Sequence, residues 1–223
     1  MYSRKLSAGT RTSPLALKQT EEALAALNKF NPEVRFEIVG IDTYGDRDKI
    51  TPISDMEGSD FFTREIEVAL LNGEIDFAVH SAKDLPDKIP DGLCIAAITK
   101  SIDPYDALVS KGNLRINELR KGAKIGASSQ RRKIQLKEYR EDFQVIDIRG
   151  TIGERLERLD HNGLDATVVA ACALVRLGLE KRITQRLPFE ILRPHPLQGS
   201  LVVEVKRDNL ELIKILSKID SRY

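Results

Sequence analysis

The sequence is poor in the residues that build metal or disulfide sites. Its 223 residues include two cysteines, three histidines, two methionines and no tryptophan. Cys94 and Cys172 each lie among apolar neighbours, so we expect reduced, buried thiols rather than a disulfide framework. None of the three histidines is grouped with a cysteine at the spacing of a zinc site, and no metal site is expected.

Long apolar runs and an excess of one charge are also missing. No segment approaches the roughly 20 apolar residues of a membrane span, and the N-terminus lacks the apolar core of a signal peptide. The 35 Lys and Arg nearly balance the 34 Asp and Glu, so the chain has no general attraction to nucleic acid or acidic membranes. We therefore expect a cytoplasmic protein without a nucleic-acid or membrane partner. Glycine-rich nucleotide loops and the GxSxG motif are absent too.

Strand-like and helix-like segments alternate along the chain, which is typical of an α/β fold. Ser13 followed by Pro14 predicts the start of a helix that continues to about Leu27. A second helix is predicted from about Asp60, with Gly73 as its end. Strands are predicted at 35–41, 75–80, 93–98, 123–128, 143–148, 164–170 and 200–207, and further helices at 129–140, 151–160, near 176 and at 208–219.

Two segments rich in turn-forming residues divide this pattern. Residues 100–104 and 194–199 are predicted hinges. If both are crossovers, residues 105–193 form domain 2, and residues 1–99 plus 200–223 form domain 1.

Arginines and hydroxyl groups gather where predicted strands end and helices begin. In an open α/β sheet this edge forms the ligand crevice, and helix N-termini there favour anions. Arginine adds a planar fork that matches a carboxylate. For any one arginine a surface ion pair is the simpler interpretation, but the whole set favours a ligand with many carboxylates. The set is Arg11, Ser13, Ser128, Ser129, Arg131, Arg132, Arg149, Gly150, Arg155 and Arg176.

The loop His80–Pro86 is a second candidate, because it places a base, an acid and a hydroxyl directly after an apolar strand. The carboxylate of Asp84 there could stabilise a cationic intermediate and move protons. An ordinary turn is the alternative, since Asp before a Leu-Pro step is common in loops.

Together these residues resemble the porphobilinogen deaminase (hydroxymethylbilane synthase) family. The resemblance covers nearly the whole chain, through GTRTSPLAL, DTYGDRD, FFTREIEVALLNGEIDFAVHSAKDLP, DPYDALVS, GASSQRR, DIRG, RLGLE and QGSL. It implies two α/β domains like those of periplasmic binding proteins, with mixed sheets and a cleft between them, plus a small third domain. It also implies a transferase that condenses four porphobilinogen molecules, with release of ammonia, to hydroxymethylbilane in tetrapyrrole and haem biosynthesis.

The resemblance assigns roles to particular residues. Asp84 is the implied catalytic carboxylate, which contacts pyrrole nitrogens, and Phe62 resembles the aromatic residue beside the growing chain. The implied binding set for the carboxylates of substrate and cofactor is Arg11, Ser13, Lys83, Ser128, Ser129, Arg131, Arg132, Arg149, Gly150, Arg155 and Arg176.

The family's dipyrromethane cofactor is tethered by a cysteine of the third domain, which would begin about where this sequence ends. Neither Cys94 nor Cys172 stands at a matching position. We therefore expect a cofactor held without a covalent bond, or a third domain supplied as a separate polypeptide. The alternative is a non-catalytic module that binds a tetrapyrrole or another polyanion on the same scaffold. Asp60 and Glu154 favour it, because they add negative charge where the family binds carboxylates.

Overall fold

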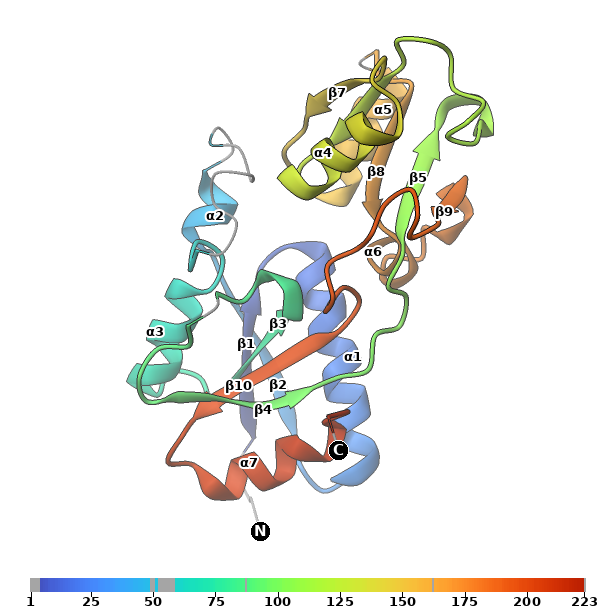
Figure 1. Ribbon diagram of the computed structural model, residues 1–223. Helices are drawn as coiled ribbons and strands as arrows, with labels where there is room; N and C mark the ends of the chain where they lie inside the picture. Colours follow the sequence, from blue (N-terminus) through green and yellow to red (C-terminus); the bar gives the residue numbers. More distant parts are fainter. Residues whose placement is uncertain (1–4, 49–50, 52–58, 87, 162, 223) are drawn as a thin grey trace. The chain divides into compact units, whose positions relative to one another are not determined.

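The computed structural model describes residues 5–48, 51, 59–86, 88–161 and 163–222 (Figure 1). The chain divides into two compact units. Unit 1 is drawn from Met1–Asp48, Gly58–Ile102 and Ser200–Tyr223, and unit 2 is built on Asp103–Gly199. The hinge segments proposed from the sequence stay a prediction.

Unit 1 contains a mixed five-stranded sheet in the order β2-β1-β3-β10-β4. Strand β1 runs parallel to both of its neighbours, β2 and β3. Strand β10 comes from the end of the chain and runs antiparallel between β3 and β4. The strands are β1 (Leu6–Arg11), β2 (Phe36–Ile41), β3 (Phe77–Ser81), β4 (Leu93–Ile98) and β10 (Leu201–Lys206).

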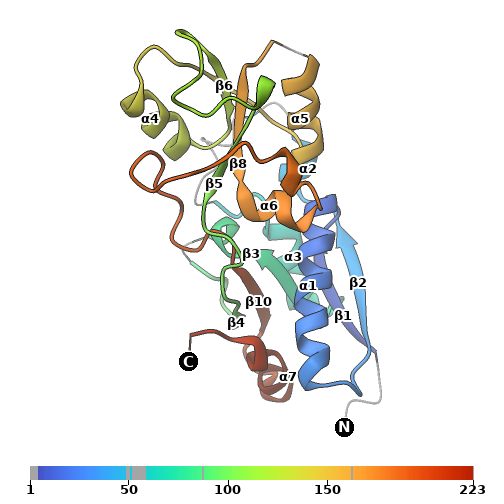
Figure 2. The same cartoon turned by 90° about the vertical axis from the view of Figure 1, so that its right-hand side faces the viewer.

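Helices cover both faces of this sheet (Figure 2). α1 (Pro14–Phe30) and α7 (Leu210–Leu216) share one apolar core with the sheet, and α3 (Arg64–Asn72) packs in a second core. The hydroxyl of Ser13 accepts a hydrogen bond from the Ala16 N–H and so caps α1. Gly73 ends α3 in the left-handed conformation, with φ 76°. The short helix α2 (Tyr44–Arg47) follows β2.

Unit 2 repeats the arrangement with the strand order β7-β6-β8-β5-β9. Strand β6 is parallel to β7 and β8, and β5 is antiparallel to β8. Helix α4 packs on one face, and α5 and α6 pack on the other. The elements are β5 (Asp106–Ser110), β6 (Lys124–Ala127), α4 (Gln130–Tyr139), β7 (Gln144–Asp147), α5 (Ile152–His161), β8 (Ala166–Ala170), α6 (Ala171–Arg176) and β9 (Gln185–Leu187).

The structure confirms the α/β class and most of the predicted helices and strands, with one correction at α3. This helix begins at Arg64, not near Asp60. The carbonyl of Asp60 instead accepts hydrogen bonds from the N–H groups of Thr63 and Arg64, which makes a turn. Phe62 therefore lies in that turn, ahead of the helix. Strands β1, β5 and β9 and helix α2 are not indicated by the sequence pattern.

In each unit the parallel strands bring their carboxyl ends to one edge of the sheet, where ligands of open α/β sheets bind. In unit 1 this edge holds Arg11, at the end of β1, and the turn Ala82–Asp84 that follows β3. In unit 2 it holds the ends of β6, β7 and β8. No helix in the described residues combines the length and apolar character needed to cross a membrane.

Candidate functional site

Arg11 in unit 1 is held between an acid and an aromatic ring. Its Nε lies 3.2 and 3.1 Å from the two carboxylate oxygens of Asp46, and its guanidinium carbon lies 4.3 Å from the centre of the Phe62 ring. Burial opposes ionisation of Asp46, but the hydrogen bonds and charge of Arg11 outweigh it and lower the pKa of that carboxyl. The guanidinium is thus oriented by the protein itself.

Phe62 keeps this position because the backbone of α2 lies directly against it. A Cβ added to Gly45 would come within 2.3 Å of a Phe62 ring carbon. The Gly45 N–H also donates to the Phe61 carbonyl, and the Phe61 and Phe62 rings meet edge to face at 5.6 Å. The aromatic residue that the sequence singles out therefore belongs to a packed cluster on which Arg11 rests.

Asp84 lies at the end of the short 3₁₀ turn that follows β3, and its side chain is partly exposed, like that of Lys83. The start of the turn is tied to its surroundings. The Ala82 N–H donates to the Ser200 carbonyl at 3.0 Å, and the Ser81 hydroxyl accepts from the Gln19 amide at 2.7 Å.

The two serines at the β6–α4 junction of unit 2 differ in role. Ser129 caps α4, since its hydroxyl accepts from the Arg132 N–H. Ser128 is buried, and its hydroxyl donates to the Ile148 carbonyl at 2.7 Å. Ser128 thereby links the end of β6 to the segment after β7.

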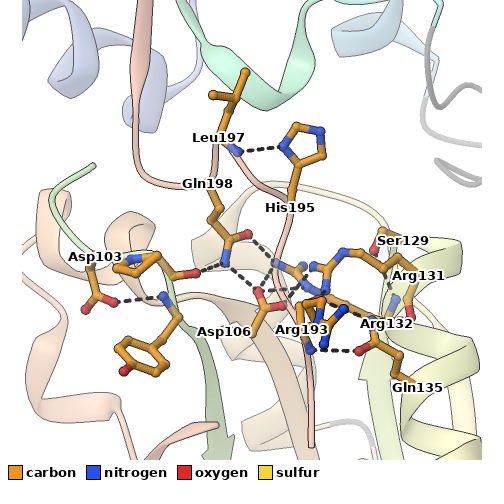
Figure 3. A network of polar contacts seen from close by, with 12 residues as sticks. Asp103, Asp106, Ser129, Arg131, Arg132, Gln135, Arg193, His195, Leu197 and Gln198 are labelled. Carbon is orange, nitrogen blue, oxygen red and sulfur yellow. Dashed lines mark hydrogen bonds and ion pairs between the residues drawn. The ribbon is translucent and has the colours of Figure 1, made fainter. Parts of the chain in front are cut away.

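Asp106 is the centre of a polar network in unit 2 (Figure 3). Its buried carboxylate accepts from Arg131 Nη2 at 2.8 Å and from Arg132 Nε at 3.1 Å and Nη2 at 2.5 Å. The buried side-chain amide of Gln198 donates to the same carboxylate at 3.0 Å and to the Pro104 carbonyl at 2.9 Å. Burial alone would raise the pKa of Asp106, yet Arg132 and Arg131 lower it to about 2.

A second group of cations follows β7. Arg155 Nε donates to the Gly150 carbonyl at 2.8 Å. Burial, together with the positive charges of Arg132 and Arg149, lowers the pKa of Arg155 to about 10. The charges of the nearby acids Asp147 and Glu154 partly offset this effect, and a bound anion would offset it further.

Glu154 lies at the start of α5 and makes a reciprocal cap with Thr151. The Thr151 N–H donates to Glu154 Oε2 at 2.6 Å, and the Glu154 N–H donates to the Thr151 hydroxyl at 3.3 Å. A Cβ at Gly150, which has φ 104°, would lie 2.6 Å from that carboxylate oxygen. The acid noted in the sequence is therefore engaged in capping the helix.

Arg176 ends α6, and its Nη2 donates to the Gly199 carbonyl at 2.9 Å. The structure thus places the residues expected from the sequence in two sets. Unit 1 holds Arg11, Ser13, Phe62, Lys83 and Asp84, and unit 2 holds Ser128, Ser129, Arg131, Arg132, Arg149, Gly150, Arg155 and Arg176.

Sequence reasoning missed the acids and the amide that orient these cations, namely Asp46, Asp106 and Gln198. One signal was present for Asp106. An acid at the start of an apolar strand, as in DALVS, needs a buried cation, and the adjacent pair Arg131 and Arg132 supplies two.

The cysteines do not suit covalent attachment of a ligand. Burial raises the pKa of the half-buried Cys94 thiol in β4, which opposes formation of the reactive thiolate. Cys172 is buried in α6. Within the described ranges no three His, Cys, Asp or Glu side chains are grouped as metal ligands.

The fold and the two sets of residues define a class: an α/β protein of two mixed five-stranded sheets, like the periplasmic binding proteins. MetQ, the methionine binding protein, matches with TM-score 0.58 and 15% identity over 96% of this chain and 89% of its own. The VFT2 domain of Bordetella pertussis BvgS matches with TM-score 0.52 and 16% identity over 96% and 85%. At such identities these likenesses concern the fold alone.

Sequence comparison gives the particular family. Residues 6–214 match the family described as "Porphobilinogen deaminase, dipyromethane cofactor binding domain". The porphobilinogen deaminase of Pelotomaculum thermopropionicum is 43% identical over 98% of this chain and 70% of its own length. That of Natranaerobius thermophilus is 46% identical over 97% and 70%. The chain belongs to the porphobilinogen deaminase family.

Proposed function

We propose that this protein is a hydroxymethylbilane synthase-type transferase that condenses four porphobilinogen molecules with release of ammonia. The observation that carries this proposal is the set of oriented arginines in unit 2, where Arg131 and Arg132 share the buried carboxylate of Asp106 and Arg155 donates to the Gly150 carbonyl. Porphobilinogen carries an acetate and a propionate, and each joined pyrrole adds another pair of carboxylates for these cations to bind.

In unit 2 the guanidinium groups bind and orient carboxylates. Arg131 and Arg132 share the single carboxylate of Asp106, so the three groups together carry a net positive charge. Their shared acid also fixes their planes, which suits bidentate recognition. Further cations are Arg149 after β7, Arg155 in α5 and Arg176 at the end of α6.

In unit 1 the carboxylate of Asp84 acts on the reacting ring. A partly exposed carboxylate can accept a hydrogen bond from a pyrrole N–H and stabilise positive charge that develops when ammonia leaves. It can also take the proton that the attacking pyrrole carbon loses. Arg11, held by Asp46 and Phe62, binds a substrate carboxylate beside it.

The dipyrromethane group that the family description names fits the cations of unit 2. The crowded guanidiniums of Arg132, Arg149 and Arg155 would hold its carboxylates, with Arg131 oriented by Asp106. When bound, this group supplies the pyrrole carbon to which the first substrate is joined. Within this chain, the arginines of unit 2 would hold it by charge and hydrogen bonds.

The test is direct turnover. The purified protein is incubated with porphobilinogen, and ammonia and uroporphyrin are measured. Asp84→Asn is expected to lower the rate at least about a hundredfold, because it removes the charge that stabilises the cation. Asp91→Asn, an exposed acid in the connection to β4, is the matched control and keeps full activity. Equal rates in the wild type and Asp84→Asn would refute the role of Asp84.

A non-catalytic tetrapyrrole-binding module is the second candidate, because the capping contact of Glu154 removes one anion position while the arginine pair on Asp106 remains. Its carboxylate occupies the Thr151 N–H that an anionic ligand would otherwise accept from. This candidate predicts binding of uroporphyrin, weakened by salt and by the pair Arg131→Ala and Arg132→Ala, with no ammonia released from porphobilinogen.

A further inference from the structure

Three ionisable side chains lie inside unit 1, on the face of the sheet that α3 covers. Glu204 of β10 is 0% exposed, Glu67 of α3 is 4% exposed and His80 of β3 is 6% exposed. The β3–β10 register pairs Ala78 with Glu204, so Glu204 and His80 point to the same face. Oε2 of Glu204 lies 3.4 Å from Nε2 of His80.

This buried cluster, Glu67–His80–Glu204, has few polar partners. In the part of the chain that the structure describes, Glu67 Oε1, His80 Nε2 and both carboxylate oxygens of Glu204 are buried without a hydrogen bond. Burial, opposed by a hydrogen bond from Thr63 and supported by the charge of Glu204, raises the pKa of Glu67. Unpaired buried polar atoms cost free energy, and apolar replacements of buried ion pairs are often as stable or more so. Stability alone therefore does not account for the cluster.

The cluster joins the two elements that carry the candidate site of unit 1. His80 is the next-to-last residue of β3, which runs directly into the turn with Asp84. Glu67 lies in the first turn of α3 and bonds to Thr63, the residue after Phe62. Glu204, on the strand beside β3, contacts His80 and acts through its charge on Glu67.

We propose that Glu204 is a positioning residue for Asp84: through His80 it fixes the end of β3, from which the turn Ala82–Asp84 departs. The assignment rests on the proposed deaminase function. The close contact between the Glu204 carboxyl and the His80 ring acts at one position of the strand and so ties the end of β3 to β10. A slip by one residue would send each side chain of the strand to the opposite face.

Glu204→Met tests this role because methionine keeps the volume and removes the carboxyl group. The melting temperature is expected to equal or exceed that of the wild type, because both oxygens that the substitution removes are buried without a hydrogen bond. The kcat for ammonia release is expected to fall at least about tenfold, and KM to change less than about threefold. Glu37→Gln, an exposed glutamate of β2, is the matched control and keeps wild-type values. A folded Glu204→Met variant with kcat within about twofold of the wild type would overturn the proposal.

Coupling with His80 is measured by a double-mutant cycle. Because Glu204 acts through His80, the double variant His80→Gln with Glu204→Gln is expected to lose no more kcat than the stronger single variant. Additive losses would assign the two residues separate roles and overturn the proposal.

Hydrogen exchange distinguishes failure of this proposal from failure of the proposed function. Amides of residues 82–85 are expected to exchange about tenfold faster in Glu204→Met, with the amides of α1 unchanged. Equal exchange in both proteins overturns the positioning role. Faster exchange in a protein whose wild type releases no ammonia supports the positioning of the turn and refutes only the deaminase function.

Discussion

Replacing Asp106 with asparagine removes the carboxylate that holds Arg131 and Arg132 in place. The carboxylate is fully buried and Arg132 is 6% exposed, so the substitution leaves a buried guanidinium without its counter-charge. Breaking a buried pair in this way costs about 3–5 kcal/mol. We expect the unfolding free energy of Asp106→Asn to fall by that amount, measured by urea denaturation near pH 7.

The pH dependence of this difference follows from the lowered pKa of Asp106. A carboxyl whose pKa falls from 3.8 to about 2 on folding contributes about 2 kcal/mol of stability. That contribution is fully present above pH 3.8 and is lost as the pH falls through about 2. Asparagine does not titrate, so the difference in unfolding free energy between wild type and variant is expected to shrink by about 1 kcal/mol as the pH falls from 5 to 3.

Asp160→Asn is the matched control, because Asp160 makes a surface pair with Arg182 in the same unit, at 2.8 Å. Surface pairs contribute about 0–1 kcal/mol. Two results would refute the reasoning: a cost for Asp106→Asn no larger than that of the control, or a gap that stays constant between pH 5 and pH 3.

Three other substitutions test the site. In Gly45→Ala the new Cβ would lie 2.3 Å from the Phe62 ring, so the ring must move; stability should fall by about 1–3 kcal/mol and KM for porphobilinogen should rise. A wild-type KM in kinetic assays would show that the ring position is unimportant. Arg155→Met removes a buried cation whose pKa is lowered to about 10, a shift that corresponds to about 3 kcal/mol against its charged form. The melting temperature of this variant should therefore stay the same or rise. Its affinity for mellitate, a benzene polycarboxylate, should fall when measured by calorimetry. Undiminished affinity would exclude Arg155 from the anion site. Glu154→Gln should bind mellitate about fivefold more tightly than the wild type at low salt, and this gain should disappear near 0.5 M salt. Equal affinities of the two proteins at low salt would mean that the Glu154 carboxylate does not oppose anionic ligands.

The helices that begin with a local capping signal could be predicted from the sequence. Ser13 before Pro14 starts α1, and Ser129 starts α4, because the capping hydroxyl and the N–H it bonds are three residues apart. Strand β1 could not be predicted, since Leu6–Arg11 is built mostly of small residues. A Cβ at Gly9 would lie 2.2 Å from Ile75, so the strand is specified by close packing against distant residues.

The cations of the site could be predicted from local sequence, but the acids that pair with them could not. Arginines at strand ends are visible as a local pattern, and Arg131, Arg149 and Arg155 lie where that pattern predicts. Asp106 lies 25 residues from Arg131, and Asp46 lies 35 residues from Arg11. Such pairs form only when the topology brings the segments together, and no periodicity in the sequence reports them.

The position of β10 sets an order for assembly during synthesis. Residues 201–206 form an interior strand of unit 1, which pairs with β3 on one side and with β4 on the other. Unit 2 can complete its own sheet as soon as residue 187 has left the ribosome. Unit 1, although it begins first, is completed only when residues 201–206 have been synthesised. The Ser200 carbonyl, which accepts from the Ala82 N–H at the start of the acid-bearing turn, becomes available at about the same step.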